Sequence, residues 1–170
     1  MIPERAALLA ELLREMRETD GDRIPDQAWH EVQKTFALPY VEILLVRESG
    51  RSREVFLTRR GSDDPHWPGR PWHIPGGMWR TSRQLLEACR DVAAGELDVQ
   101  VTACRELFTC KWSDHPYGHP ISHVCLCDVA TPPRPSDDGQ YFPLTTLPEP
   151  LLVRHREFLD RLSRLSDLTV

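Results

Sequence analysis

The sequence lacks the features that would place the chain in a membrane or outside the cell. None of its apolar runs approaches the roughly 20 residues of a membrane-spanning helix. The N-terminal segment is rich in Glu and Arg and has no apolar stretch typical of a signal peptide. We therefore expect a cytoplasmic protein that has no membrane partner.

The sequence also lacks an even set of cysteines and an excess of positive charge. Five cysteines in a chain without a signal peptide do not indicate a disulfide framework, so we expect buried free thiols. A net charge of -5 argues against nucleic acid as a partner, because such a partner requires a broad basic surface. A nucleotide needs only one local basic pocket and is not excluded.

What the 170 residues do contain is the pattern of one α+β domain without internal repeats. Apolar residues at helical spacing predict helices over residues 3–19, 26–36, 82–97 and 151–165. Apolar runs and alternation predict strands over residues 40–47, 54–59, 99–110, 119–129 and 140–144. This order favours helices packed on a mixed sheet.

The most informative stretch begins at Trp72 and runs through His73-Ile74-Pro75-Gly76-Gly77 into the third predicted helix. A short strand, a tight glycine loop and a helix start are typical of a phosphate or metal site, because glycine lets a ligand approach the backbone. A Gly-Gly pair alone is weak support, since most such pairs are turns.

This stretch resembles the Nudix box, whose family pattern is G-x5-E-x7-R-E-U-x-E-E-x-G-U, with U a bulky aliphatic residue. The lead-in resembles the Trp-x-x-Pro-Gly-Gly that usually precedes the box. Segments near residues 39–43, 55–60 and 141–150 also resemble the family. The resemblance implies a Nudix fold, with a mixed sheet packed between helices, over residues 38–170. Residues 1–37 would form an N-terminal helical extension.

The box departs from the family pattern at most of its acidic positions. With Gly77 as the first glycine, Glu96 and Val99 match the pattern. The positions that do not match are Arg83, Asp91, Val92, Gly95 and Asp98. At about 100° per helical residue, Asp91 lies roughly 140° from Glu96, so we expect it on a solvated face, together with Glu87.

The resemblance implies a divalent cation, Mg2+ or Mn2+, held by helix glutamates. Glu96 is the one matching carboxylate, so it is the candidate catalytic and metal residue, with the backbone of Gly76 and Gly77 as further metal ligands. One carboxylate cannot satisfy a hard cation, so metal binding should be weak without substrate. The implied function is a weak hydrolase of a nucleoside diphosphate linked to another moiety. The alternative is an inactive module for ligand sensing or protein interaction.

Within the family, the GDP-mannose mannosyl hydrolases are the nearest resemblance. They also lack the glutamate at the position of Val92 and keep the one at Glu96. The resemblance of this chain to these hydrolases implies a nucleotide-sugar ligand and a histidine base in the loop before the last short strand. Here that loop, residues 131–139, has Asp137 and Asp138 but no histidine, so the base does not carry over.

Four further side chains are candidates for substrate contact, and His119 is a further candidate catalytic residue. Arginine binds phosphate in a bidentate manner, which suggests Arg70 and Arg80. Trp72 and Trp112 could stack on a base or sugar ring, although for Trp72 the favoured interpretation is packing beneath the glycine loop. The sequence leaves open whether the chain forms a homodimer.

Overall fold

The computed structural model describes residues 2–18, 26–50, 52–64, 66–80, 82–116, 118–165 and 168. The helices are α1 (Pro3–Glu18), α2 (Asp26–Thr35), α3 (Leu85–Leu97) and α4 (Val153–Ser163). The strands are β1 (Ala37–Leu44), β2 (Val46–Ser49), β3 (Ser52–Arg59), β4 (Trp72–His73), β5 (Gly76–Met78), β6 (Val101–Lys111), β7 (His119–Val129) and β8 (Gly139–Pro143).

The strands form two sheets. The first has the order β5-β1-β7-β6, in which β1 and β7 are parallel and the outer pairs are antiparallel. The second is built around β3, which pairs with β2, β4 and β8. The first sheet is therefore mixed, as the sequence predicts.

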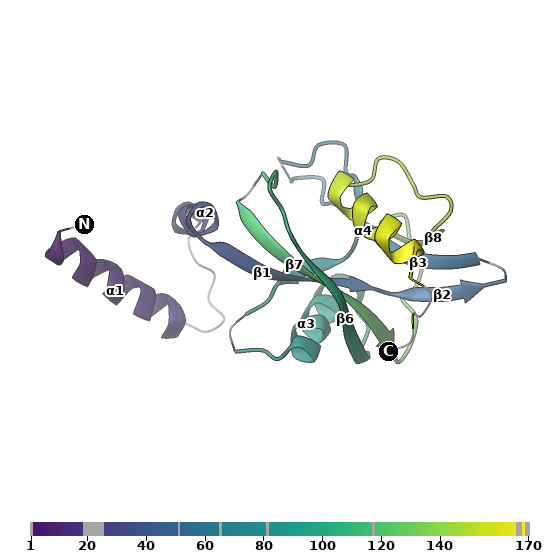
Figure 1. Ribbon diagram of the computed structural model, residues 1–170, viewed down its shortest axis with the longest axis horizontal. Coiled ribbons are helices and arrows are strands. Elements are labelled where there is room, and N and C mark those ends of the chain that lie inside the picture. The colour runs from purple at the N-terminus through teal and green to yellow at the C-terminus, as the bar shows by residue number, and fades with distance from the viewer. Residues whose placement is uncertain are drawn as a thin grey trace.

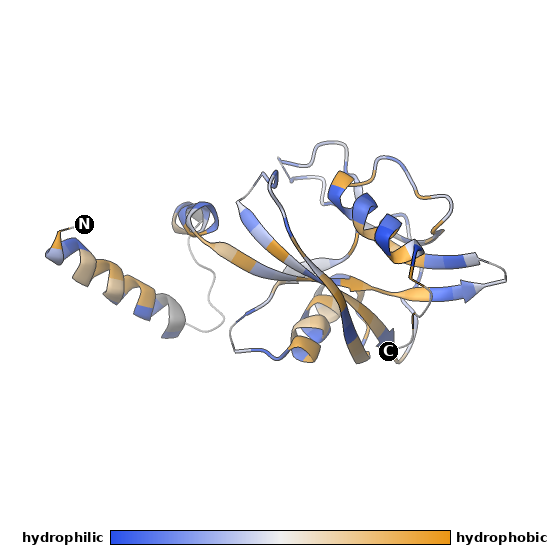
Figure 2. Ribbon diagram, in the orientation of Figure 1, coloured by the Kyte–Doolittle hydropathy of each residue, from blue (hydrophilic) through white to orange (hydrophobic). Residues whose placement is uncertain are grey.

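Helices α3 and α4 cover opposite faces of the first sheet (Figure 1). Alternate residues of β1 supply the two cores, since Ile43 packs with the α3 face and Leu44 with the α4 face. Figure 2 shows apolar residues gathered in the strands at the centre of the molecule. This arrangement confirms the α+β prediction. No described helix combines the length and the apolar character of a membrane span.

The five cysteines are free thiols, as predicted. Cys89 of α3 and Cys125 and Cys127 of β7 are buried, and Cys104 and Cys110 are half-buried. Their positions agree with a packing role in the core.

The two N-terminal helices differ in how they meet the sheet. Helix α1 lies apart from it, and its leucines Leu8, Leu9, Leu12 and Leu13 are exposed (Figure 1). Helix α2 contacts β1 and β7. The predicted end of the first helix at residue 19 lies outside the described residues.

Three predicted elements need correction. The first predicted strand is divided into β1 and β2 by Leu45, where the chain leaves one sheet for the other. The glycine loop is a strand, because Gly76 and Gly77 pair with β1. The third helix begins at Leu85 rather than Ser82, after a capping bond from the Gln84 N–H to Glu87 Oε2 at 2.8 Å.

Candidate functional site

The site is organised around Gly76 at the edge of the first sheet. Gly76 lies opposite Glu42, and the next pair along is hydrogen-bonded, with the Ile43 N–H donating to Pro75 O at 2.9 Å. Hydrogen-bonded and non-bonded pairs alternate between antiparallel strands, so the Gly76 N–H and C=O point away from β1. The N–H donates to Glu96 Oε1 at 3.3 Å, which brings the end of α3 to this edge.

A side chain at position 76 would collide with a second carboxylate. A Cβ there would lie 2.0 Å from Glu42 Oε2. Side chains approach closely at a non-hydrogen-bonded pair, so glycine is what lets the Glu42 carboxyl cover the strand. Two carboxyl groups, Glu42 from β1 and Glu96 from α3, therefore contact the same glycine from different sides.

Glu42 is buried on the α4 face and is held by a chain of donors. Ser122 Oγ donates to Glu42 Oε1 at 2.8 Å, and Trp112 Nε1 donates to Ser122 Oγ at 2.8 Å. Burial raises the pKa of Glu42 to about 8, against the Ser122 hydrogen bond, and the nearby Glu96 raises it further. The group is therefore poised to hold a proton at neutral pH.

The surroundings of Glu96 also favour its neutral form. The residue is exposed overall, but loss of water around its carboxyl group raises the pKa to about 7. The Gly76 N–H and the positive charge of Arg60 act in the opposite direction. The Arg60 side chain, 28% exposed, lies 3.7 Å from Asp64 and is the main cation near both carboxyl groups.

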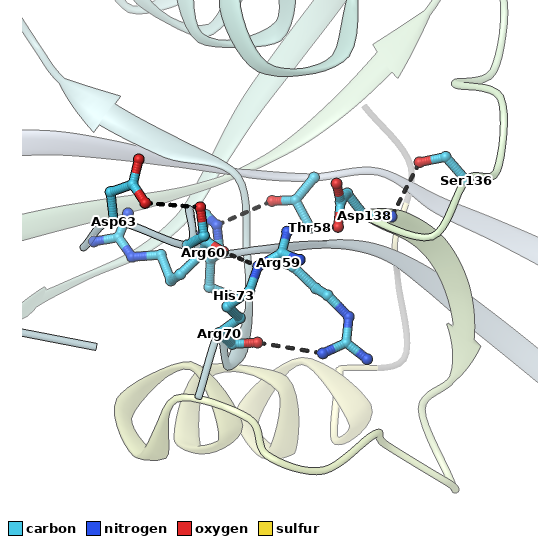
Figure 3. A network of polar contacts seen from close by, with 9 residues as sticks. Thr58, Arg59, Arg60, Asp63, Arg70, His73, Ser136 and Asp138 are labelled. Carbon is cyan, nitrogen blue, oxygen red and sulfur yellow. Dashed lines mark hydrogen bonds and ion pairs between the residues drawn. The ribbon is translucent and has the colours of Figure 1, made fainter. Parts of the chain in front are cut away.

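Two buried histidines stand beside Glu42 as neutral rings. His155 Nδ1 accepts the Ile74 N–H at 2.7 Å, so the neutral ring carries its proton on Nε2, 3.9 Å from Glu42 Oε2. His73 Nδ1 donates to Ile74 O at 2.8 Å, and Nε2 faces Thr58 Oγ1 at 3.1 Å (Figure 3). Burial lowers the pKa of His73 to about 4 and that of His155 well below its ordinary value.

Two cavities meet at Gly76. One, of about 460 Å³, we call the histidine pocket. Its walls include Trp29, Tyr40, Glu42, Arg60, His66, His73, Trp112, His115 and His155. The other, of about 430 Å³, we call the helix groove. Its walls include Gly76, Gly77, Arg80, Arg83, Asp91, Val92 and Glu96. Gly76 is a lining residue of both cavities, so they lie next to one another at the edge of the first sheet.

The structure brings half of the predicted site residues together. Gly76, Gly77, Arg80 and Glu96 all line the helix groove. Trp112 lines the histidine pocket, where its Nε1 is already bonded to Ser122.

The other three predicted site residues lie elsewhere. Trp72 is 3% exposed and packs against Phe142 in the core, where a ligand cannot stack on it. Arg70 pairs with Asp138 at 2.7 Å. His119 lies opposite Ala37 at the start of β1. Ala37 precedes Glu42 by five residues, so His119 is roughly 16 Å along the strand from Glu42.

The departures from the Nudix box form contacts of their own. Arg83 and Asp91 are ion-paired at 2.9 Å. The family pattern has glutamate at position 83 and arginine at position 91, so the two charges are exchanged in this chain. Asp91 is 53% exposed, as expected of a solvated face, and it also lines the groove. Asp98, at the position of the late glycine, has a left-handed backbone with φ 52° and ψ 42°. That conformation supports the register of the box.

Glu42, Arg60, His73 and His155 were not expected from the sequence. A signal was available for Glu42, because it is the one charged residue within the apolar run of residues 40–46. An acid there is either exposed by alternation or buried with partners, and only the fold distinguishes the two. The histidines come from β4 and α4, which the sequence does not bring together.

The donor set fits a divalent cation incompletely. Glu96 and the outward-facing Gly76 carbonyl are hard oxygen donors of the kind that Mg2+ prefers, but that ion takes about six ligands. Across the described residues there is no group of three or more His, Cys, Asp or Glu that could hold a metal ion. A cation at Gly76 would need oxygens from a bound ligand.

One of the comparisons with known proteins shows the family. A family model described as NUDIX domain matches residues 37–162. No curated protein matches the chain.

Several solved structures share the fold. A MutT NUDIX hydrolase from Burkholderia pseudomallei has 22% identity and a TM-score of 0.62, covering 75% of this chain and 98% of that one. The NUDIX domain of Shewanella oneidensis NrtR, solved in complex with ADP ribose, has 18% identity and a TM-score of 0.58, covering 86% and 96%. NrtR complexed with a 27mer DNA has 19% identity and a TM-score of 0.55, covering 72% and 58%.

Proposed function

Because the chain belongs to the Nudix family, we propose that it binds and slowly hydrolyses a nucleoside diphosphate linked to another moiety, such as a nucleotide sugar. The observation that carries this proposal is the junction of two cavities at Gly76. One cavity has aromatic and imidazole walls suited to a base and ribose, and the other has Arg80 and Glu96.

The diphosphate would cross Gly76, between Arg60 on one side and Arg80 on the other. Guanidinium groups bind phosphate oxygens well, and a glycine strand edge allows close approach of the backbone. A divalent cation, Mg2+ or Mn2+, would neutralise phosphate charge when bound with the ligand. Glu96 would supply its carboxylate, which requires loss of a proton at neutral pH.

Turnover should be slow, because a single box carboxylate remains. The loop that holds the histidine base in the GDP-mannose mannosyl hydrolases offers two aspartates here. Asp138 is paired with Arg70 at 2.7 Å, which leaves Asp137 as the candidate base in that loop. A nucleotide sugar as the ligand therefore stays a proposal.

A non-catalytic ligand-binding module is the second candidate. The box pattern has glutamate, arginine and glutamate at positions 83, 91 and 92. In this chain the first two positions hold the Arg83–Asp91 ion pair and the third holds the buried Val92. NrtR has a NUDIX domain that was solved with ADP ribose, so binding of a nucleotide ligand has a precedent in this fold.

Turnover and binding assays distinguish the two candidates. ADP-ribose and nucleotide sugars would be incubated with Mg2+ or Mn2+, and release of nucleotide products would be followed by chromatography. Glu96→Gln should abolish turnover and retain ligand binding by calorimetry. Glu87→Gln, the same change on the outer side of α3, should retain both. Binding without turnover in the unaltered protein would favour the module.

Cytoplasmic localisation, a homodimer and the division into residues 1–37 and 38–170 stay predictions.

A further inference from the structure

One wall of the histidine pocket comes from outside the segment that defines the family. The Nudix match begins at residue 37, whereas α2 ends at Thr35. Yet Trp29, His30 and Gln33, all from α2, line the pocket beside Tyr40 and Trp112. This part of the site is therefore not specified by the family.

Helix α2 is fitted closely to the domain rather than resting loosely on it. A Cβ at Gly118, in the connection between β6 and β7, would lie 2.1 Å from Gln33 O. Glycine at 118 therefore lets the backbone of α2 approach the sheet. Gln33 is 7% exposed as a result.

The Gln33 side chain has an unused acceptor. The side chain is hydrogen-bonded to Tyr40, and its Oε1 is buried without any hydrogen-bond partner. Burying an acceptor without a partner costs free energy, and a ligand that supplies an N–H group would recover it. The residue lines the pocket, so its side chain lies at the wall that a bound ligand would contact.

We propose that α2 is a specificity element, in which Gln33 Oε1 accepts a hydrogen bond from the exocyclic amino group of a nucleobase bound in the histidine pocket. Trp29, which is half-buried, provides an aromatic wall for that base. Among donors of suitable size, an amino group on a planar ring combines the N–H with a face that this indole can contact. This inference rests on the proposed function and names the feature of the ligand that is recognised.

The test compares ligands that differ by one amino group. ADP would be compared with purine riboside diphosphate, GDP with IDP, and CDP with pyrimidinone riboside diphosphate, together with the corresponding nucleosides. Binding would be measured by calorimetry for the unaltered protein, Gln33→Met and Gln33→Glu. Gln27→Met, on the exposed side of the same helix, is the matched control.

The unaltered protein should bind one amino-bearing ligand about tenfold more tightly than its partner. Gln33→Met should lose this preference, and Gln33→Glu, which keeps an acceptor oxygen, should retain it. A purely structural role for Gln33 would instead weaken both members of each pair equally in both variants. Melting curves identify any variant that is unfolded.

The inference and the proposed function fail in different ways. If diphosphates are bound and hydrolysed but Gln33→Met keeps the amino preference, the inference is wrong and the function stands. If nucleosides show the Gln33-dependent preference while no diphosphate derivative is hydrolysed, the inference stands and the hydrolase assignment is wrong. Absence of binding by every nucleoside and nucleotide overturns both.

Discussion

Gly76 shows how one residue without a side chain fixes the geometry of the site. Its missing Cβ leaves room for the Glu42 carboxyl, and its N–H holds Glu96. Its carbonyl points off the sheet edge, because position 76 is not a hydrogen-bonded pair with β1. One glycine thus joins two carboxyl groups, a backbone acceptor and two cavities.

Gly76→Ala should destabilise the protein by about 1–3 kcal/mol, since the methyl group must displace the buried Glu42 side chain. Urea denaturation would measure the change in the free energy of unfolding. Gly61→Ala, at a position where an added Cβ meets nothing within 4 Å, is the control and should have little effect. Equal stability of the two variants would show that Glu42 does not lie over Gly76.

Asp98 is a second position where backbone conformation decides the outcome. Its φ of 52° lies in the left-handed region, which glycine adopts readily and other residues adopt at a cost. Asp98→Gly should therefore stabilise the protein by roughly 0.5–1 kcal/mol in thermal denaturation. Asp98→Ala keeps the Cβ and should not stabilise it. A destabilised glycine variant would mean that the aspartate side chain contributes more than its backbone costs.

At the scale of the elements, helix α3 is joined to the preceding loop by the Arg83–Asp91 ion pair. Arg83→Glu should destabilise the protein by roughly 0.5 kcal/mol, because it places two acids together at a half-exposed site. The double variant Arg83→Glu, Asp91→Arg should recover that loss of stability, because it restores an ion pair with the charges in the order of the family pattern. A double-mutant cycle by chemical denaturation measures the coupling. A double variant no better than Arg83→Glu would show that the pair contributes nothing.

The same contact changes how the metal site should be rebuilt. Glutamate at positions 83, 92 and 95 would surround Asp91 with negative charge, so Asp91→Arg must accompany these changes. Val92→Glu will still cost stability, because Val92 is 9% exposed and its side chain approaches Gly77. The fourfold variant should melt at a clearly higher temperature with Mn2+ than without it. Equal melting under both conditions would indicate that the loop does not present a metal site.

Periodicity predicted the long elements well, and local pairing decided the short ones. The predicted strand over residues 119–129 coincides with β7, and α3 ends at Leu97 as expected. The pair Gly76–Gly77 is predicted as a turn, because glycine has no side chain and so shows no alternation of apolar and polar residues. It becomes a strand through its register with β1, which is a long-range contact.

One part of the candidate site could be predicted from the sequence and the other could not. The helix groove could be predicted from the box, since Gly76, Gly77 and Glu96 lie within one strand–helix unit. The histidine pocket could not, because Glu42, His155 and Gln33 come from segments far apart in the sequence. Their meeting depends on the parallel pairing of β1 with β7 and on the docking of α2 and α4.

For the whole molecule, the buried titratable groups set how stability depends on pH. Glu42 has its pKa raised to about 8 from an ordinary 4.5, so the folded state binds an extra proton between these values. His73 and His115 have their pKa lowered to about 4 from 6.5 by burial, so there the unfolded state binds more protons. From pH 4.5 to about 7.5 the two effects oppose one another.

Above about pH 7.5 the histidines are almost entirely neutral in both states, and the raised carboxyl groups alone remain. Stability should then fall as pH rises from about 7.5 to 9, by about 1 kcal/mol from Glu42 and by a smaller amount from the exposed Glu96. Chemical denaturation in chelator at pH 7.5 and pH 9 would measure the change. Glu42→Gln keeps the hydrogen-bonding shape of the neutral acid and should remove most of the slope, whereas Glu48→Gln on exposed β2 should leave it intact. A slope of the same size in Glu42→Gln would mean that Glu42 titrates near its ordinary pKa, and hence that water reaches its carboxyl group.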